Sequence, residues 1–267
     1  MIDLTSQAGF PLLLDSDILD VMTPGEVSFI RETRTIGELR AILREPTDLP
    51  DLTPVYWNFK LKGAGSAEPD ISELGLTFGL VCLPPLKIGK EYVKTHGHYH
   101  SVMPGSEIAF PEVYTHYYGE SYLYMQRRQK GKTFDLDDCV LYRMMPGHSI
   151  MIPPGYAHIL INPSSEPALT AGLYALEAIH DYGPIRKMAG GAYYFIEQDE
   201  VLKVVPNPRY PELPPLRELL NLEGTRFAPP AGDLPLWSAF IQEPQRFAFI
   251  TRSHLATRQF LFEDQTI

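Results

Sequence analysis

Three histidines alternate along one short segment of the chain, which reads Thr95-His96-Gly97-His98-Tyr99-His100. In an extended strand alternate side chains share a face, so His96, His98 and His100 would point the same way. Imidazole nitrogens are common ligands for divalent transition metals. A lone histidine is more often part of a satisfied core, but three in alternation favour a metal site.

The next segment that resembles a strand, Glu112 to Tyr118, begins with a carboxylate. Period-two alternation would place Glu112, Tyr114, His116 and Tyr118 on one face. A carboxylate among aromatic side chains is costly to bury alone but suits a metal ligand. Without the neighbouring histidines, Glu112 would be interpreted as a surface residue of a strand.

A fourth candidate ligand, His158, follows a turn rich in glycine and proline. Gly155 can adopt a positive φ at little cost, and Pro153 and Pro154 fix an extended bend. His158 would then start a new strand and point inward. The alternative interpretation is a core histidine in a hairpin.

The elements that must position these residues are mostly strands. Between Val55 and Val205, short β-branched and aromatic runs alternate with glycine, proline and acidic turns, which predicts an all-β sandwich or barrel. Before it, Thr35 and Glu38 have capping-box spacing and predict a helix from Thr35 to Arg44. We therefore expect an N-terminal extension with one helix (1–54), a barrel carrying the metal site (55–205) and a proline-rich C-terminal extension (206–267), with a short helix at 216–222.

Composition narrows the class of protein. The 267 residues are 44% hydrophobic and 21% charged, which suffices for a buried core. A net charge of −10 argues against nucleic-acid binding, which would require a basic stripe. No stretch of 18 apolar residues could span a membrane, and the acidic N-terminal residues do not resemble a signal peptide. With only Cys82 and Cys139, both expected to be buried thiols, we predict a cytoplasmic protein.

Two of these segments resemble the cupin family. Residues 147–162 match its second motif, G-x5-P-x-G-x2-H-x3-N, at every fixed position. The first motif, G-x5-H-x-H-x3-4-E-x6-G, is matched in part by His98, His100, Glu112 and Gly119. The resemblance implies a double-stranded β-helix, or jelly-roll barrel.

The match to the first motif departs in two places. Gly89 lies further upstream than the pattern asks, and eleven residues (101–111) separate the second histidine from Glu112. This insert resembles a widened hairpin loop and contains Glu107, the competing candidate for the carboxylate ligand. The resemblance implies one divalent ion, Fe²⁺, Mn²⁺, Zn²⁺ or Ni²⁺, and the ligands His98, His100, Glu112 and His158.

A more specific resemblance covers residues 77–210. The runs IGKEYVKTHGHYH, PEVY, PPGYAHILIN and AIHDYGPI are similar to those of the cupin-type glucose-6-phosphate isomerases of archaea. The run His180-Asp181-Tyr182-Gly183 distinguishes this family from other cupins, because general cupin motifs do not contain it. The resemblance implies a hexose 6-phosphate substrate and interconversion of glucose 6-phosphate and fructose 6-phosphate through a cis-enediol, a reaction of glycolysis and gluconeogenesis.

The same resemblance implies roles for single residues. Glu112 would be both ligand and proton carrier, Tyr114 would bond substrate hydroxyls, and His180 and Tyr182 would close the sugar pocket. We therefore take Glu112, Tyr114 and His180 as the catalytic candidates.

For the phosphate, the resemblance implies Thr95 and Gly97, with Thr77 in weaker register. On strand propensity alone, Thr77 and Thr95 could equally be ordinary strand residues. His96 and His116 depart from the family pattern. They could be supporting donors, substrate contacts or alternative ligands.

Rival functions remain open at this point. They are another cupin metalloenzyme (a mannose-6-phosphate isomerase, an epimerase or a dioxygenase) and a non-enzymatic sugar-phosphate-binding cupin, since fold alone does not fix function. The cupin resemblance also implies a homodimer that hides the exposed edges of strands.

Overall fold

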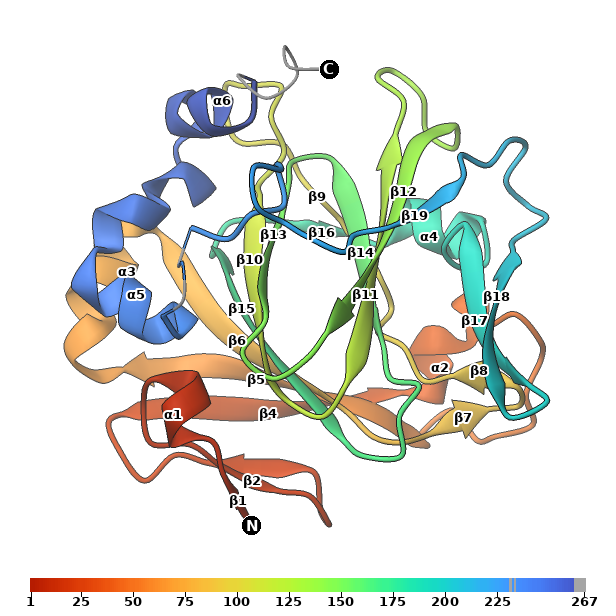
Figure 1. Ribbon diagram of the computed structural model, residues 1–267, viewed down its shortest axis with the longest axis horizontal. Coiled ribbons are helices and arrows are strands. Elements are labelled where there is room, and N and C mark those ends of the chain that lie inside the picture. The colour runs from red at the N-terminus through yellow and green to blue at the C-terminus, as the bar shows by residue number, and fades with distance from the viewer. Residues whose placement is uncertain (231, 233, 262–267) are drawn as a thin grey trace.

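The core of the protein consists of two mainly antiparallel sheets that face one another, as the computed structural model in Figure 1 shows. The structure describes residues 1–230, 232 and 234–261. The larger sheet has the strand order β13 (Ser149–Ile152), β10 (Glu112–Tyr118), β15 (Ala168–Ala175), β6 (Leu76–Leu83), β5 (Pro54–Ala64) and β4 (Val27–Thr35). The smaller sheet has the order β14 (Tyr156–Ile161), β11 (Ser121–Arg128), β12 (Leu136–Met144) and β19 (Leu216–Glu218). This arrangement confirms the predicted all-β jelly-roll fold.

A tight hairpin carries the chain from one sheet to the other between β10 and β11. Gly119 lies at its turn with φ +73°, a conformation that residues with a Cβ rarely adopt. A Cβ at this position would also come within 2.1 Å of the Pro167 carbonyl oxygen. The glycine that ends the first cupin-like motif is therefore required by the close passage of two chain segments.

Shorter elements surround the two sheets. One small sheet consists of β1 (Ile2–Asp3), β2 (Leu13–Asp15) and β3 (Asp20–Met22). In a second, β9 (Tyr99–His100) pairs with β16 (His180–Asp181). A third consists of β7 (Lys87–Ile88), β8 (Glu91–Tyr92), β17 (Tyr193–Gln198) and β18 (Val201–Pro206). The α-helices are α1 (Thr5–Ala8), α2 (Ile36–Leu39), α3 (Glu68–Leu74), α4 (Gly183–Lys187), α5 (Leu236–Gln242) and α6 (Ser253–Leu261). In the part of the chain that the structure describes, 3₁₀ helices cover Arg40–Ile42, Gly65–Ala67 and Pro244–Ile250.

The two predicted helices have different outcomes. The first begins as expected, because the Thr35 N–H donates to the Glu38 carboxylate at 2.9 Å, but α2 ends at Leu39 and continues as a 3₁₀ turn to Ile42. The predicted helix at 216–222 is wrong. Its first residues form β19, whose Leu216 pairs in parallel with Cys139 of β12. The open edge of β12 offers backbone partners that local helix propensity does not outweigh.

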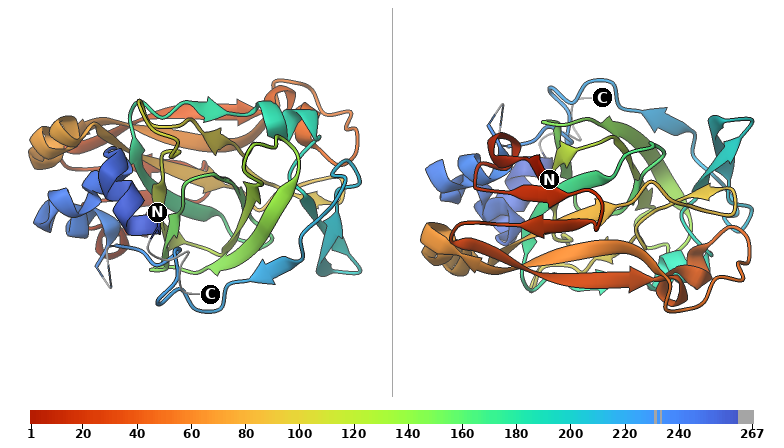
Figure 2. Two further views of the ribbon diagram at one scale, coloured as in Figure 1. Left: turned by 90° about the horizontal axis from the view of Figure 1, so that it is seen from above. Right: turned by 90° about the horizontal axis from the view of Figure 1, so that it is seen from below.

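Both ends of the chain pack closely against the sheets. Strand β4 pairs along its whole length with β5, so residues 27–35 extend the larger sheet. The 3₁₀ helix Pro244–Ile250 packs against α3 and lies between α5 and α6 (Figures 1 and 2). Trp237 of α5 contacts Phe78 and Phe10 at ring distances of 5.1 and 5.4 Å. Burial of such aromatic side chains stabilises the contact between the C-terminal helices and the barrel.

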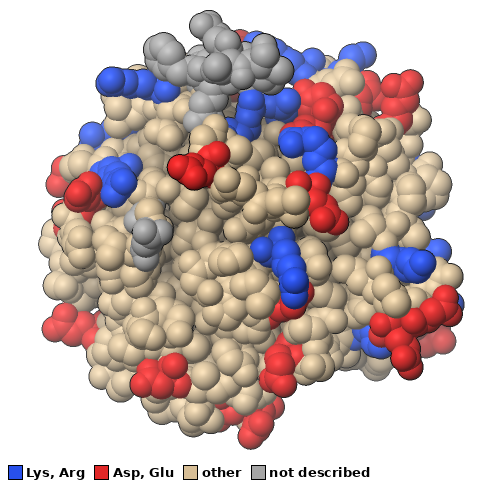
Figure 3. All heavy atoms as spheres, in the orientation of Figure 1, with Lys and Arg blue, Asp and Glu red and all other residues tan. Residues whose placement is uncertain are grey.

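Charged side chains are scattered over the surface. On the face shown in Figure 3, acidic and basic residues are interspersed. Within the described residues, the helices are all too short or too polar to traverse a lipid bilayer.

Candidate metal centre and substrate cavity

Four side chains from three parts of the barrel converge at its inner face. The ligand-type atoms of His98, His100, Glu112 and His158 all lie within 4.8 Å of one another. Pairing of the strands brings them together, since His98 forms a β-bridge with His158 and Glu112 begins β10. Three imidazoles and one carboxylate at this spacing could hold a divalent transition metal.

The histidine at position 96 does not join this cluster, which corrects the expectation that three alternate histidines share a face. Gly97 has φ +74°, so the backbone leaves the extended conformation between His96 and His98. A Cβ at Gly97 would approach the Ile159 side chain to 2.5 Å, which favours glycine there. The His96 ring instead packs on Tyr182 at 4.6 Å, and its Nε2 accepts a hydrogen bond from Arg186 at 3.1 Å.

The hydrogen bonds of the cluster fit a metal ion. His158 is 2% exposed, and neither of its ring nitrogens has a hydrogen-bond partner among the described residues. Buried polar atoms rarely remain unpaired, and a cation in the cluster would supply a partner for Nε2. In His100, Nδ1 donates to the Phe110 carbonyl at 2.9 Å, which leaves Nε2 as an acceptor, and this Nε2 faces Nε2 of His98 at 3.2 Å inside the cluster.

Glu112 completes the cluster. Its Oε2 lies 3.3 Å from Nε2 of His158 and 3.5 Å from Nε2 of His100. Burial raises the pKa of Glu112 to about 7, and the nearby His100 opposes that rise. The competing candidate Glu107 lies elsewhere, exposed and paired with Lys130 at 3.1 Å.

Gly172 on the neighbouring strand β15 makes room for the two functional side chains of β10. It lies opposite Tyr114 in the sheet register. A Cβ on Gly172 would come within 2.6 Å of a Glu112 carboxylate oxygen and 2.9 Å of the Tyr114 ring. Any larger residue would therefore displace the carboxylate from the cluster.

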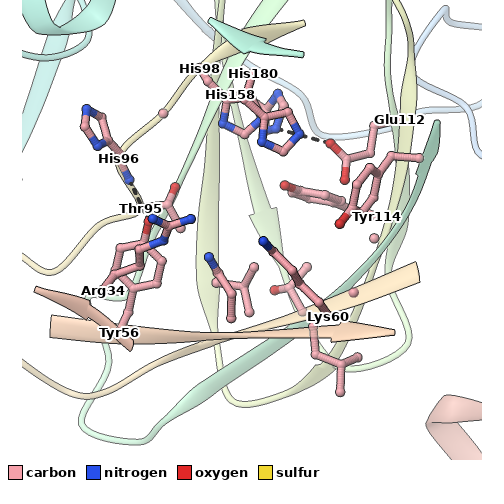
Figure 4. A pocket seen from close by; sticks show the side chains of 18 of the residues that line it. Arg34, Tyr56, Lys60, Thr95, His96, His98, Glu112, Tyr114, His158 and His180 are labelled. Carbon is pink, nitrogen blue, oxygen red and sulfur yellow. Dashed lines mark hydrogen bonds and ion pairs between the residues drawn. The ribbon is translucent and has the colours of Figure 1, made fainter. Parts of the chain in front are cut away.

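A cavity opens beside the cluster, and most of the predicted site residues line it (Figure 4). His180 stacks on His98 with ring centroids 4.0 Å apart, and burial lowers its pKa to about 3. Burial also raises the pKa of Tyr114 well above its usual value. The predicted residues that line the cavity are Thr95, Gly97, His98, Glu112, Tyr114, His158, His180 and Tyr182. The predicted phosphate ligand Thr77 does not line it.

Several lining residues were not singled out from the sequence. Strand β5 contributes Tyr56, Asn58 and Lys60, and β4 contributes Arg34. The period-two alternation of Tyr56, Asn58 and Lys60 is the signal that could have identified them. Arg34 was missed for another reason, because β4 lies in the segment 1–54 that the sequence predicts as an extension.

The remaining candidate, His116, lies in the core. Its Nδ1 is 2.8 Å from the Thr170 hydroxyl, and its Nε2 is 3.2 Å from the Gly119 carbonyl oxygen. The residue is fully buried and does not line the cavity. Burial lowers its pKa to about 4. Among the alternatives left open by the sequence, the contacts of His116 fit a supporting donor within the sheet.

A jelly-roll barrel with a three-histidine, one-carboxylate cluster at its inner face defines the cupin class of proteins. Comparison with known proteins narrows the class further. Residues 33–212 match the family described as Glucose-6-phosphate isomerase (GPI), and the chain belongs to this family. This confirms the prediction of an isomerase of that family.

Individual relatives agree with the family assignment. A protein from Thermococcus kodakarensis named glucose-6-phosphate isomerase is 30% identical over 210 residues, which cover 76% of this chain and 97% of the relative. One of the same name from Pyrococcus furiosus is 32% identical over 145 residues, covering 54% and 70%. Among solved structures, the vicilin from Solanum melongena is similar with a TM-score of 0.35 and 11% identity, covering 51% and 33%, which is too distant to bear on function.

Proposed function

We propose that this protein interconverts glucose 6-phosphate and fructose 6-phosphate, with one divalent metal ion held by His98, His100, Glu112 and His158. The observation that carries the proposal is the four-residue cluster, of which His98, Glu112 and His158 also line the cavity, in a chain of this family. Fe²⁺, Mn²⁺, Zn²⁺ and Ni²⁺ all suit the donor set.

The isomerisation moves a proton between C2 and C1 of the open-chain sugar through a cis-enediol. A bound divalent ion would stabilise the negative charge that develops on the two sugar oxygens, as a Lewis acid. Glu112 is the carboxylate that lines the cavity beside the cluster, so it is our candidate for taking the proton from one carbon and returning it to the other.

Other lining residues would orient the sugar. Tyr114 and Tyr182 offer phenol hydroxyls, and His180 lies stacked on the ligand His98. The Thr95 hydroxyl oxygen accepts a hydrogen bond from the Leu160 N–H at 3.0 Å, so its own proton can be donated to a phosphate. Gly97, which has no Cβ, allows a phosphate oxygen to approach the backbone closely.

The direct test is turnover by the metal-reconstituted protein. Fructose 6-phosphate would be supplied, and glucose 6-phosphate formation followed with a coupled dehydrogenase. We expect activity that disappears after EDTA treatment and in His158→Ala. A fully metal-loaded sample that turns over none of the hexose 6-phosphates would contradict the proposal and favour an oxygenase or a sugar-phosphate-binding cupin.

We further propose that the protein works in the cytoplasm as a homodimer. In support, β4 is the outermost strand of the larger sheet and presents Ile30 with 53% exposure. An unpaired strand edge with an exposed apolar side chain favours pairing with a second copy. Light scattering coupled to gel filtration measures the mass, and a monomer at micromolar concentration contradicts this part.

A further inference from the structure

One arginine from the N-terminal strand β4 lies in the cavity together with the metal-binding cluster. We propose that Arg34 binds the phosphate group of the substrate and sets the preference for phosphorylated over free sugars. This inference rests on the proposed isomerase function, whose substrate carries a phosphate dianion. It assigns a specificity role to a residue that lies before the barrel segment predicted from the sequence.

The position of Arg34 is the first step of the argument. Arg34 pairs with Tyr56 in the sheet register, and both line the cavity. In Figure 4 the Arg34 side chain lies beside Thr95 and Tyr56, across the cavity from Glu112 and Tyr114. A sugar with its C1 and C2 at the cluster would therefore direct its far end toward Arg34.

The second step is that the guanidinium is held in place and still has donors to offer. Its Nη1 donates to the Glu38 carboxylate at 2.7 Å. Glu38 in turn accepts from the Thr35 N–H at the start of α2, so the carboxylate is fixed. Among the described residues, Nε and Nη2 of Arg34 have no hydrogen-bond acceptor, and their parallel N–H groups suit a phosphate.

The third step concerns the charged side chains of the cavity wall. Among the described lining residues, the cationic side chains are Arg34 and Lys60, and the one carboxylate is Glu112 of the cluster. The side of the cavity near Arg34 therefore favours an anion.

The other cation of the cavity, Lys60, is a weaker candidate. Its ammonium pairs with Glu32 at 2.9 Å, and its side chain is 53% exposed, against 28% for Arg34. Water screens an exposed charge, so Lys60 would contribute less to binding an anion than the more buried guanidinium.

The test compares Arg34→Met with Arg31→Met. Arg31 lies three residues earlier on the same strand, stacks over Trp57 at 5.1 Å and does not line the cavity, so it is a matched control for loss of one charge from β4. We expect Arg34→Met to raise the KM for fructose 6-phosphate roughly 10- to 150-fold, with a smaller change in kcat. Arg34→Lys should give an intermediate KM, and Arg31→Met should leave the wild-type value.

Inhibition separates phosphate recognition from general damage to the site. We expect Arg34→Met to weaken competitive inhibition by sorbitol 6-phosphate by the same factor, and to leave any inhibition by sorbitol unchanged. Metal content and thermal unfolding of the variant should match those of the wild type. An unchanged KM in Arg34→Met, or an equal loss of affinity for both inhibitors, overturns the inference while wild-type turnover still supports the isomerase. If the wild type shows no turnover, the proposed function fails, and binding of sorbitol 6-phosphate measured by calorimetry in both variants decides the role of Arg34 alone.

Discussion

Two histidines of the barrel are similarly buried. His158 on β14 lies beside the cavity, and His116 lies on β10 within the core. Burial lowers the pKa of each to about 4. Their hydrogen bonds differ. Both ring nitrogens of His116 have partners, in Thr170 and Gly119, whereas among the described residues those of His158 have no hydrogen-bond partner and Nε2 has only the Glu112 carboxylate 3.3 Å away.

The difference separates a histidine that completes a core from one that awaits a ligand. Burial and a lowered pKa show only that the charged form is disfavoured, which holds for both residues. The lack of a hydrogen-bond partner for the His158 nitrogens among the described residues fits a role in binding a metal ion. The contrast predicts that substitution of His158 lowers activity, whereas substitution of His116 lowers stability.

The largest effect is expected at the cluster. His158→Ala, or removal of the metal with EDTA, should lower kcat/KM by at least about 10⁴-fold, because Lewis-acid stabilisation worth several kcal/mol is lost together with the position of Glu112. Steady-state kinetics and metal analysis of the same sample check this. Readdition of a divalent metal should restore the EDTA-treated wild type but not the variant; wild-type-like activity in His158→Ala would remove the cluster from the mechanism.

A somewhat smaller effect is expected for Glu112→Gln at saturating metal. The amide keeps the shape but cannot accept a proton, so kcat should fall about 10²- to 10⁴-fold. Exchange of the sugar C2 proton with solvent deuterium, followed by NMR, should slow by the same factor. Exchange at the wild-type rate with metal bound would mean that another group moves the proton.

The pH dependence of stability sharpens the comparison for the metal-free protein. The pKa of His116 is about 4 when folded, against an ordinary 6.5, so the unfolded chain binds the proton first as pH falls. The stability that this residue contributes is complete above pH 6.5 and is lost between pH 6.5 and 4, by about 3 kcal/mol. The free energy of unfolding, measured with urea at several pH values in this range, should fall less steeply with decreasing pH for His116→Asn than for the wild type. Equal dependence on pH in the two proteins would contradict the assignment.

The smallest effect is expected for His116→Ala at neutral pH. The Thr170 hydroxyl would lose its buried partner, which should reduce the free energy of unfolding by about 1–3 kcal/mol. Metal content and kcat should stay at wild-type values. The exposed His254→Ala serves as the control for loss of an imidazole, and loss of metal from His116→Ala but not from His254→Ala would place His116 in the metal site.

The sequence predicted the barrel because the pattern of short strands and turns is local. The resemblance to the two cupin motifs implied the set His98, His100, Glu112 and His158, and these four residues lie together in the structure. The error at His96 arose where local backbone geometry departs from a regular strand, at the positive φ of Gly97.

What the sequence did not reveal depends on pairing between distant segments. Arg34 enters the cavity only because β4 pairs with β5 and β5 with β6. Likewise, Leu216 becomes a strand residue only because the edge of β12 is open to it. Neither partnership leaves a periodic signal in the segment itself, so helix propensity and proline content were poor guides there.

The order of strands in the larger sheet has a consequence for how the chain folds during synthesis. β6 pairs on one side with β5, but on the other with β15, where Leu76 faces Ala175. Strand β4, which carries Arg34, can thus pair early with β5. Strand β15 can pair with β6 only after roughly a hundred further residues have been synthesised. Pairing across such separations is slow because the loop must close before its contacts form. We therefore expect the cavity to form late in folding, with the hairpin of β4 and β5 paired before β10, β14 and β15 complete the remaining walls.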